Sequence, residues 1–294
     1  MLDLLVSTLI QGLIYALVSF GVYITYSILD FPDLGVDGTF PLGAAVTAVL
    51  LTRGCDPYLT LLAAICVGAL AGLCTGIVHV KLHVRNLLAG IITMTALFSI
   101  NLQIAGSNLT VERAVDTIFT AAPTMAVLGG LSLTMRKLAV SLLLVVLVKV
   151  LLDVFFRTKA GLLLRAVGDN AGLVTTLAKD MGNVKIAGLT LANALVALGG
   201  ALVCHETRSF SATMGTGQLV FGLATVIIGV TLFRRFTFVQ GTTAVVFGSI
   251  LYKLCIAIAL DLGLPPNMMK LITAALFLLV LVASGRKGEE IIHA

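Results

Sequence analysis

Apolar runs long enough to cross a bilayer recur along almost the whole of this 294-residue chain. A helix needs about 20 apolar residues to span the hydrocarbon core of a membrane. Hydrophobic residues make up 59% of the sequence and charged residues only 11%, too little charge to cover a soluble domain of this size. The pattern predicts one all-α, polytopic membrane domain over residues 1–294. The expected spans are about 5–28, 36–52, 58–80, 86–106, 138–156, 184–205, 218–233, 241–260 and 267–284.

One long polar and basic segment, residues 157–185, interrupts these apolar runs. Loops rich in Arg and Lys lie on the cytoplasmic side of a membrane, so the segment is expected there. Alternating the spans from this point also places the C-terminus in the cytoplasm. Eleven basic residues then lie inside and five outside, which agrees with the rule. The inside set is Lys81, Arg85, Arg157, Lys159, Arg165, Lys179, Lys185, Arg234, Arg235, Arg286 and Lys287, and the outside set is Arg53, Arg113, Arg136, Lys137 and Arg208.

The beginning of the chain is less regular. Residues 30–38 include three carboxylates, those of Asp30, Asp33 and Asp37, together with a proline and two glycines. Counting spans puts this stretch in the cytoplasm and the N-terminus outside. A broken helix that enters the membrane partway is the alternative, which Pro41 leaves open.

A mixed-charge segment, residues 107–137, separates two spans. It is predicted to be a long extracytoplasmic loop, which can include a short surface helix. Loops of this length are often functional.

The sequence offers little for catalysis or metal binding. His79 and His83 are four residues apart and could share a helix face, but no nearby acidic residue completes a metal site. No C-x-x-C pair, G-x-S-x-G motif or G-x-x-x-x-G-K-[ST] phosphate loop occurs. The basic residues are dispersed among loops, so nucleic-acid binding is not expected. We therefore expect neither an enzyme nor a metal or cofactor site.

Three glycines in the third expected span, Gly68, Gly72 and Gly76, are four residues apart. They form a smooth groove on one helix face, where another backbone can approach closely. Packing within the chain is the favoured interpretation, and a dimer interface is the alternative. Among the charged residues inside spans, Lys149 and Asp153 are expected to pair. Lys253 lies deeper, and its role is left open.

Small polar residues inside the spans can line a solute pathway if they face a cavity. Ser and Thr can equally bond back to their own helix, and both interpretations stay open for each such residue. Asp37 and Thr39 are favoured because irregular backbone at membrane depth needs a cavity to line. The mostly apolar pathway suits a solute with an aromatic or aliphatic side chain better than a sugar. The other candidates are Thr93, Thr95, Ser99, Asn101, Thr190, Asn193 and Thr225.

Several motifs resemble those of a known transporter family. They are GLLLRAVGDN at 161–170, KIAGL at 185–189 and ALGGA at 197–201. In this order they are similar to the membrane permeases of ABC importers, in the branched-chain amino acid and ribose permease family. The stretches 28–45 and 213–229 resemble a narrower subgroup associated with uptake of tryptophan or other aromatic amino acids.

The resemblance implies an assembly of two permease copies, two cytoplasmic ATPases that hold ATP and Mg²⁺, and an extracytoplasmic solute-binding protein. The chain would lie in the cell membrane, with a helix pair in 157–185 docked on the ATPase and a tight turn at Gly168. Segment 107–137 and residues 205–217 would receive the binding protein. The solute would pass the broken second span and Gly222. An ATPase-independent transporter or channel is the alternative. The coupling residues would be Arg165, Ala166, Gly168, Asp169, Asn170 and Lys179.

Overall fold

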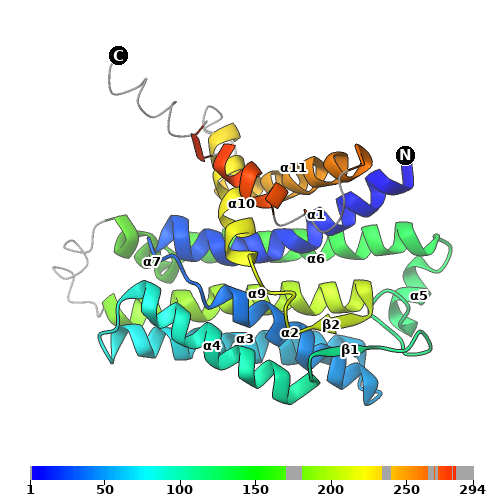
Figure 1. Cartoon of the computed structure of the whole chain (residues 1–294), viewed down its shortest axis with the longest axis horizontal. Coiled ribbons are helices and arrows are strands. Elements are labelled where there is room, and N and C mark those ends of the chain that lie inside the picture. The colour runs from blue at the N-terminus through cyan, green and yellow to red at the C-terminus, as the bar shows by residue number, and fades with distance from the viewer. Residues whose placement is uncertain are drawn as a thin grey trace.

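The computed structural model describes residues 2–169, 181–233, 240–263, 268, 271–279 and 281–282. This part of the chain is mainly a bundle of long helices whose axes run in similar directions (Figure 1). The helices are α1 (Leu2–Val22), η1 (Tyr23–Ile28), α2 (Val36–Thr52), α3 (Pro57–Val80), α4 (Asn86–Ala105), α5 (Ala122–Leu128), α6 (Leu133–Arg157), α7 (Lys159–Asp169), α9 (Met181–Thr207), α10 (Gln218–Phe233) and α11 (Gly241–Asp261).

Six helices in the described residues are long and apolar enough to cross a membrane. They are α1 with η1, α3, α4, α6, α9 and α11, while α2 and α10 are shorter apolar helices. The all-α, polytopic membrane fold expected from the apolar runs is confirmed. Of the last expected span, 267–284, residues 271–279 are helical.

The second span is broken. Helix α1 continues as the π-helix η1, and the chain then takes a non-helical course over residues 29–35 before α2 begins. At the start of α2, Gly38 packs against Met94 and Leu97, close to the middle of α4. Figure 1 shows the same arrangement, with α2 beginning inside the bundle and not at the end where α1 stops. The structure therefore favours a helix that enters partway.

Helix α9 lies at the centre of the bundle and is held by close glycine contacts. A Cβ on Gly68, Gly72 or Gly76 would meet α9, at Ala197, Leu189 and Ile186 respectively. Because the three glycines face α9, the interpretation as packing within the chain is confirmed. Close backbone approach increases van der Waals contact, which replaces the hydrophobic effect as the force between helices in lipid.

Replacing Gly72 with leucine is expected to push α3 away from α9 and to destabilise the protein by about 2 kcal/mol, in the range for overpacked cores. The thermal unfolding midpoint of the purified protein in detergent measures the effect. Cys74→Leu is the matched control, because Cys74 is exposed on the same helix. Equal midpoints for the two variants would contradict the packing.

At one end of the bundle, the segment between α4 and α6 pairs with the segment that follows α9. Strands β1 (Asn108–Thr110) and β2 (Ser209–Ser211) form an antiparallel ribbon in which Leu109 lies opposite Phe210. Arg208 donates hydrogen bonds to the carbonyl oxygens of Glu112 and Val115, at 2.8 and 2.7 Å. The short helix expected in 107–137 is α5, whereas the ribbon was not predicted, because three-residue strands leave no alternating pattern.

The structure rules out one local possibility and contradicts one local prediction. His79 and His83 do not share a helix face, since α3 ends at Val80 and His83 has a positive φ of 55°. Gly168 is not at a turn, because α7 continues through it to Asp169. A Cβ on Gly168 would collide with the carbonyl oxygen of Ile28 in η1. The glycine therefore permits α7 to pack closely against the end of η1.

Candidate solute pathway and coupling surface

The N-termini of two short helices, α2 and α10, meet at Asp37. Its carboxylate accepts hydrogen bonds from the backbone N–H groups of Gly217 and Leu219, at 2.9 and 2.8 Å. The N-terminus of a helix carries a partial positive charge and unpaired N–H groups, so a carboxylate there is stabilising. Asp37 thus caps α10 from inside α2 and fixes the two helices to each other.

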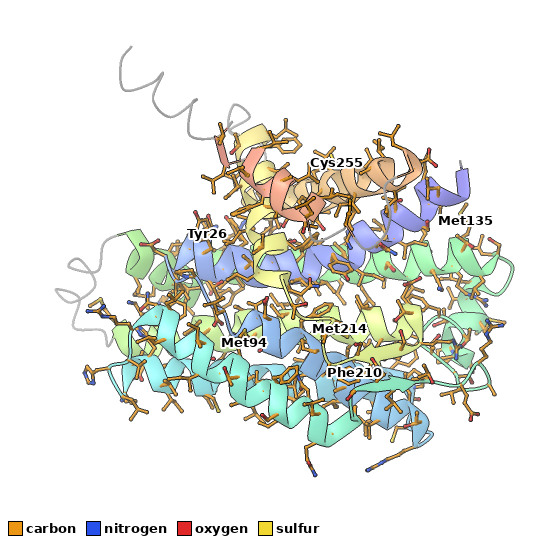
Figure 2. The ribbon with its side chains drawn as sticks, viewed as in Figure 1. Tyr26, Met94, Met135, Phe210, Met214 and Cys255 are labelled. Atoms are coloured by element: carbon orange, nitrogen blue, oxygen red, sulfur yellow. The ribbon has the colours of Figure 1, made fainter. Side chains whose placement is uncertain are left out.

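A cavity of about 280 Å³ lies beside this junction, and three of the predicted pathway residues line it: Asp37, Thr95 and Asn101. Asn101 donates to the carbonyl oxygen of Gly38 at 3.1 Å, while its own amide oxygen is buried without a partner among the described residues. Met94, labelled in Figure 2, is one of the apolar residues of the lining. The cavity combines an apolar wall with a few polar groups, as small-solute sites do. The remaining lining residues, which were not among the pathway candidates, are Gly38, Pro41, Phe98, Ala212 and Thr216.

Two other predicted pathway residues, Thr39 and Asn193, belong to a buried network and not to this cavity. Asn193 donates to the Asp33 carboxylate at 2.8 Å and accepts from the Thr39 hydroxyl at 2.8 Å. Asp33 also accepts from the N–H of Gly35 at 2.8 Å. The network fixes the 29–35 connection to the middle of α9. Sequence reasoning missed Asp33, although an intramembrane carboxylate and an asparagine on another span are a natural pair.

Three further pathway candidates hold helices together. The Thr93 hydroxyl bonds with Thr75 at 3.0 Å, which joins α3 to α4. The Thr225 hydroxyl lies 2.7 Å from that of Ser19 and joins α1 to α10. Gly222 lies against Val22 and lets α10 approach α1. The structure therefore brings only part of the predicted set together around one cavity.

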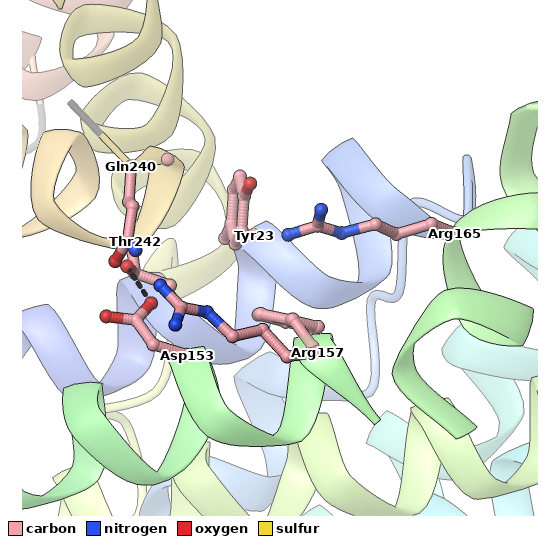
Figure 3. A pocket seen from close by; sticks show the side chains of 8 residues that line it. Tyr23, Asp153, Arg157, Arg165, Gln240 and Thr242 are labelled. Carbon is pink, nitrogen blue, oxygen red and sulfur yellow. Dashed lines mark hydrogen bonds between the residues drawn. The ribbon is translucent and has the colours of Figure 1, made fainter. Parts of the chain in front are cut away.

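At the opposite end of the bundle from the ribbon, α7 carries the predicted coupling residues. The Arg165 guanidinium lies 5.0 Å from the centre of the Phe156 ring and borders a cavity of about 350 Å³. Figure 3 shows Arg165 extending towards Tyr23, back to the bundle. Ala166 packs against the core. Asp169 ends α7, while Asn170 and Lys179 lie outside the described residues.

The same cavity contains a paired carboxylate. Asp153 accepts from Lys149 at 2.7 Å. It also accepts from the Thr242 hydroxyl at 2.5 Å, the bond drawn in Figure 3. The expected pairing of Lys149 with Asp153 is confirmed. When the Gln240 amide is oriented to donate to Asp153, its oxygen accepts from Arg157 at 3.2 Å. These bonds join the C-terminal end of α6 to the N-terminal end of α11. Helix α7 therefore lies beside two helices that are hydrogen-bonded to each other.

The bundle of spanning helices, the two shorter apolar helices and the cavity at their junction are those of a multi-pass membrane transport protein. Residues 4–281 match the model of the family described as the permease component of branched-chain amino acid transport systems. The chain therefore belongs to this family, as its motifs predict. It is a transport component and not an enzyme.

Two curated proteins are similar over nearly the whole chain. A tyrosine transport system permease protein of Clostridioides difficile (strain R20291) is 40% identical over 281 residues, which are 96% of this chain and 91% of that protein. An uncharacterised protein of Rickettsia prowazekii (strain Madrid E) is 29% identical over 294 residues, 99% of this chain and all of that protein. No solved structure matches the chain.

Proposed function

We propose that this chain is the membrane permease of an ATP-driven ABC importer for an aromatic amino acid, with tyrosine as the first candidate. The observation that carries the proposal is the 40% identity, over 96% of the chain, to a permease of a tyrosine transport system. The mostly apolar cavity with a few polar groups at the junction of α2 and α10 supports a small amphipathic solute.

In the proposed assembly, a separate cytoplasmic ATPase binds ATP and Mg²⁺ and docks on α7 and residues 170–185. A second copy of the permease completes the pathway in the cell membrane. The binding protein delivers the solute at the opposite end, where β1, β2 and α5 lie together. This arrangement puts the N-terminus outside and the C-terminus in the cytoplasm, in agreement with the distribution of basic residues.

Uptake of radiolabelled tyrosine tests the proposal. Cells that contain the permease, its ATPase and its binding protein are expected to take up tyrosine, and an ATPase variant without hydrolysis should abolish uptake. Competition with tryptophan, phenylalanine, leucine and ribose for the binding protein defines the solute class. Uptake that survives loss of ATP hydrolysis would identify an ATPase-independent transporter instead. Binding of ribose alone would exclude an amino-acid importer.

A further inference from the structure

Lys253 places a positive charge halfway along α11, a spanning helix. Its Nζ atom lies 3.5 Å from the centre of the Tyr15 ring and 5.4 Å from that of Phe221. The ion pairs within the described residues join Lys137 to Glu206 and Lys149 to Asp153, and none involves Lys253. An intramembrane lysine is costly and normally faces a pathway or a partner, and contact with aromatic rings offsets only about 2 kcal/mol.

A groove connects Lys253 to the end of the bundle that carries the ribbon. It has a volume of about 310 Å³ and lies between the outer halves of α1 and α11, with Leu4 and Asp261 at its mouth. Ser7 and Gln11 line it from α1, and Tyr15 follows at the same spacing of four residues, so the three side chains share one helix face. Polar side chains on one face of a spanning helix, next to a lysine, are unfavourable in contact with lipid tails. This face is therefore expected to border water.

Gln218, the first residue of α10, lies beside the same aromatic ring. Its side chain lies close to the Tyr15 phenol, and its amide nitrogen donates to the carbonyl oxygen of Met214 at 3.0 Å. The amide oxygen, Oε1, is buried and has no hydrogen-bond partner in the described part of the chain. Tyr15 is thus flanked by an unpaired cation and an unpaired acceptor.

These two groups complement a zwitterionic amino acid. A carboxylate can bind the Lys253 ammonium, and an α-ammonium group can donate to Oε1 of Gln218. Beside Lys253 the groove is lined by the apolar residues Ile256, Ala257 and Leu260 of α11. Such a lining accepts an aromatic or aliphatic side chain.

We propose that Lys253, Tyr15 and Gln218 form a site at mid-membrane depth that binds the carboxylate and ammonium groups of the transported amino acid. The inference rests on the proposed transport function and adds the residues that recognise the solute. The site is connected to the α2–α10 junction, because Leu219, the neighbour of Gln218, donates its N–H to Asp37.

Lys253→Met tests the site, because it removes the charge and keeps a long side chain. Loss of a charge-assisted hydrogen bond, about 1.5–3 kcal/mol, corresponds to a decrease in tyrosine uptake of about tenfold or more. Lys253→Arg keeps the charge and should retain at least about a third of wild-type uptake. Cys255→Ser is the matched control on the same helix, and its exposed position predicts wild-type uptake.

Assembly is measured in parallel by copurification of the complex and by size-exclusion chromatography. A wild-type complex that takes up no tyrosine would overturn the proposed function and this inference with it. Wild-type uptake with unchanged uptake by Lys253→Met would overturn the inference alone. Loss of the dimer or of the ATPase in Lys253→Met would show a structural contact and would also overturn it, as would a Lys253→Arg variant no more active than Lys253→Met.

Discussion

Replacing Asn193 with leucine is expected to destabilise the permease by about 3 kcal/mol, among the largest single effects in the bundle. The amide of Asn193 donates to the Asp33 carboxylate and accepts from the Thr39 hydroxyl. Leucine offers neither group, so a buried carboxylate loses a partner in a low-dielectric environment. The 29–35 connection should then detach from α9. The thermal unfolding midpoint in detergent measures the loss.

Thr190→Val is the control for this variant. Thr190 lies one turn earlier on α9, and its hydroxyl bonds back to the carbonyl oxygen of Ile186 in the same helix. Its replacement should cost little because no contact between helices depends on it. If the two variants unfold at the same temperature, the network around Asp33 does not stabilise the fold.

Replacing Gly168 with valine is expected to uncouple ATP hydrolysis from transport. The added side chain would collide with the carbonyl oxygen of Ile28, so α7 must move away from the end of η1. Overpacking of this kind costs about 1–3 kcal/mol. If α7 moves away to relieve it, we expect coupled uptake to fall by about tenfold, the ratio equivalent to about 1.4 kcal/mol. In the proposed assembly, a movement of the ATPase shifts α7, and the contact between α7 and η1 passes the shift to α1 as a rigid-body displacement. The variant would break that contact. Tyrosine uptake and ATP hydrolysis, measured on the same proteoliposomes, separate the two activities.

Ala160→Val is the matched variant, because Ala160 is exposed on the same helix. It adds the same β-branched side chain without a collision and should leave coupling intact. Wild-type uptake by Gly168→Val, with normal membrane insertion, would show that close contact between α7 and η1 is unnecessary for transport.

The helices of this protein could be predicted from the sequence because the membrane imposes one length and one composition on every span. The pair Lys149 and Asp153, and the three glycines of α3, were also predictable, since helical spacing alone places them. The family could be predicted from three short motifs, at 161–170, 185–189 and 197–201, that occur in the expected order. These features depend on residues close together in the chain.

The candidate site was harder to predict because it depends on contacts between distant segments. Thr39 and Asp37 lie two residues apart, yet one binds Asn193 in the core and the other caps α10 beside a cavity. Nothing in the sequence distinguishes a polar side chain that faces a cavity from one that faces another helix. Gly168 shows the same limit, because a glycine that permits close packing looks like one that permits a turn. Lys253 acquires a role only when α1 and α10 are placed around it.

The two hydrogen bonds to Asp37, from Gly217 just before α10 and from Leu219 within it, have a mechanical consequence. A helix that crosses the whole bilayer transmits any tilt from one leaflet to the other, whereas α2 begins beside the middle of α4. Loss of those two bonds would release the N-terminal end of α10 from α2 without unwinding a helical turn. The rest of α10 would stay attached to α1 through Thr225 and Ser19, so any tilt of α10 is expected to turn about that contact.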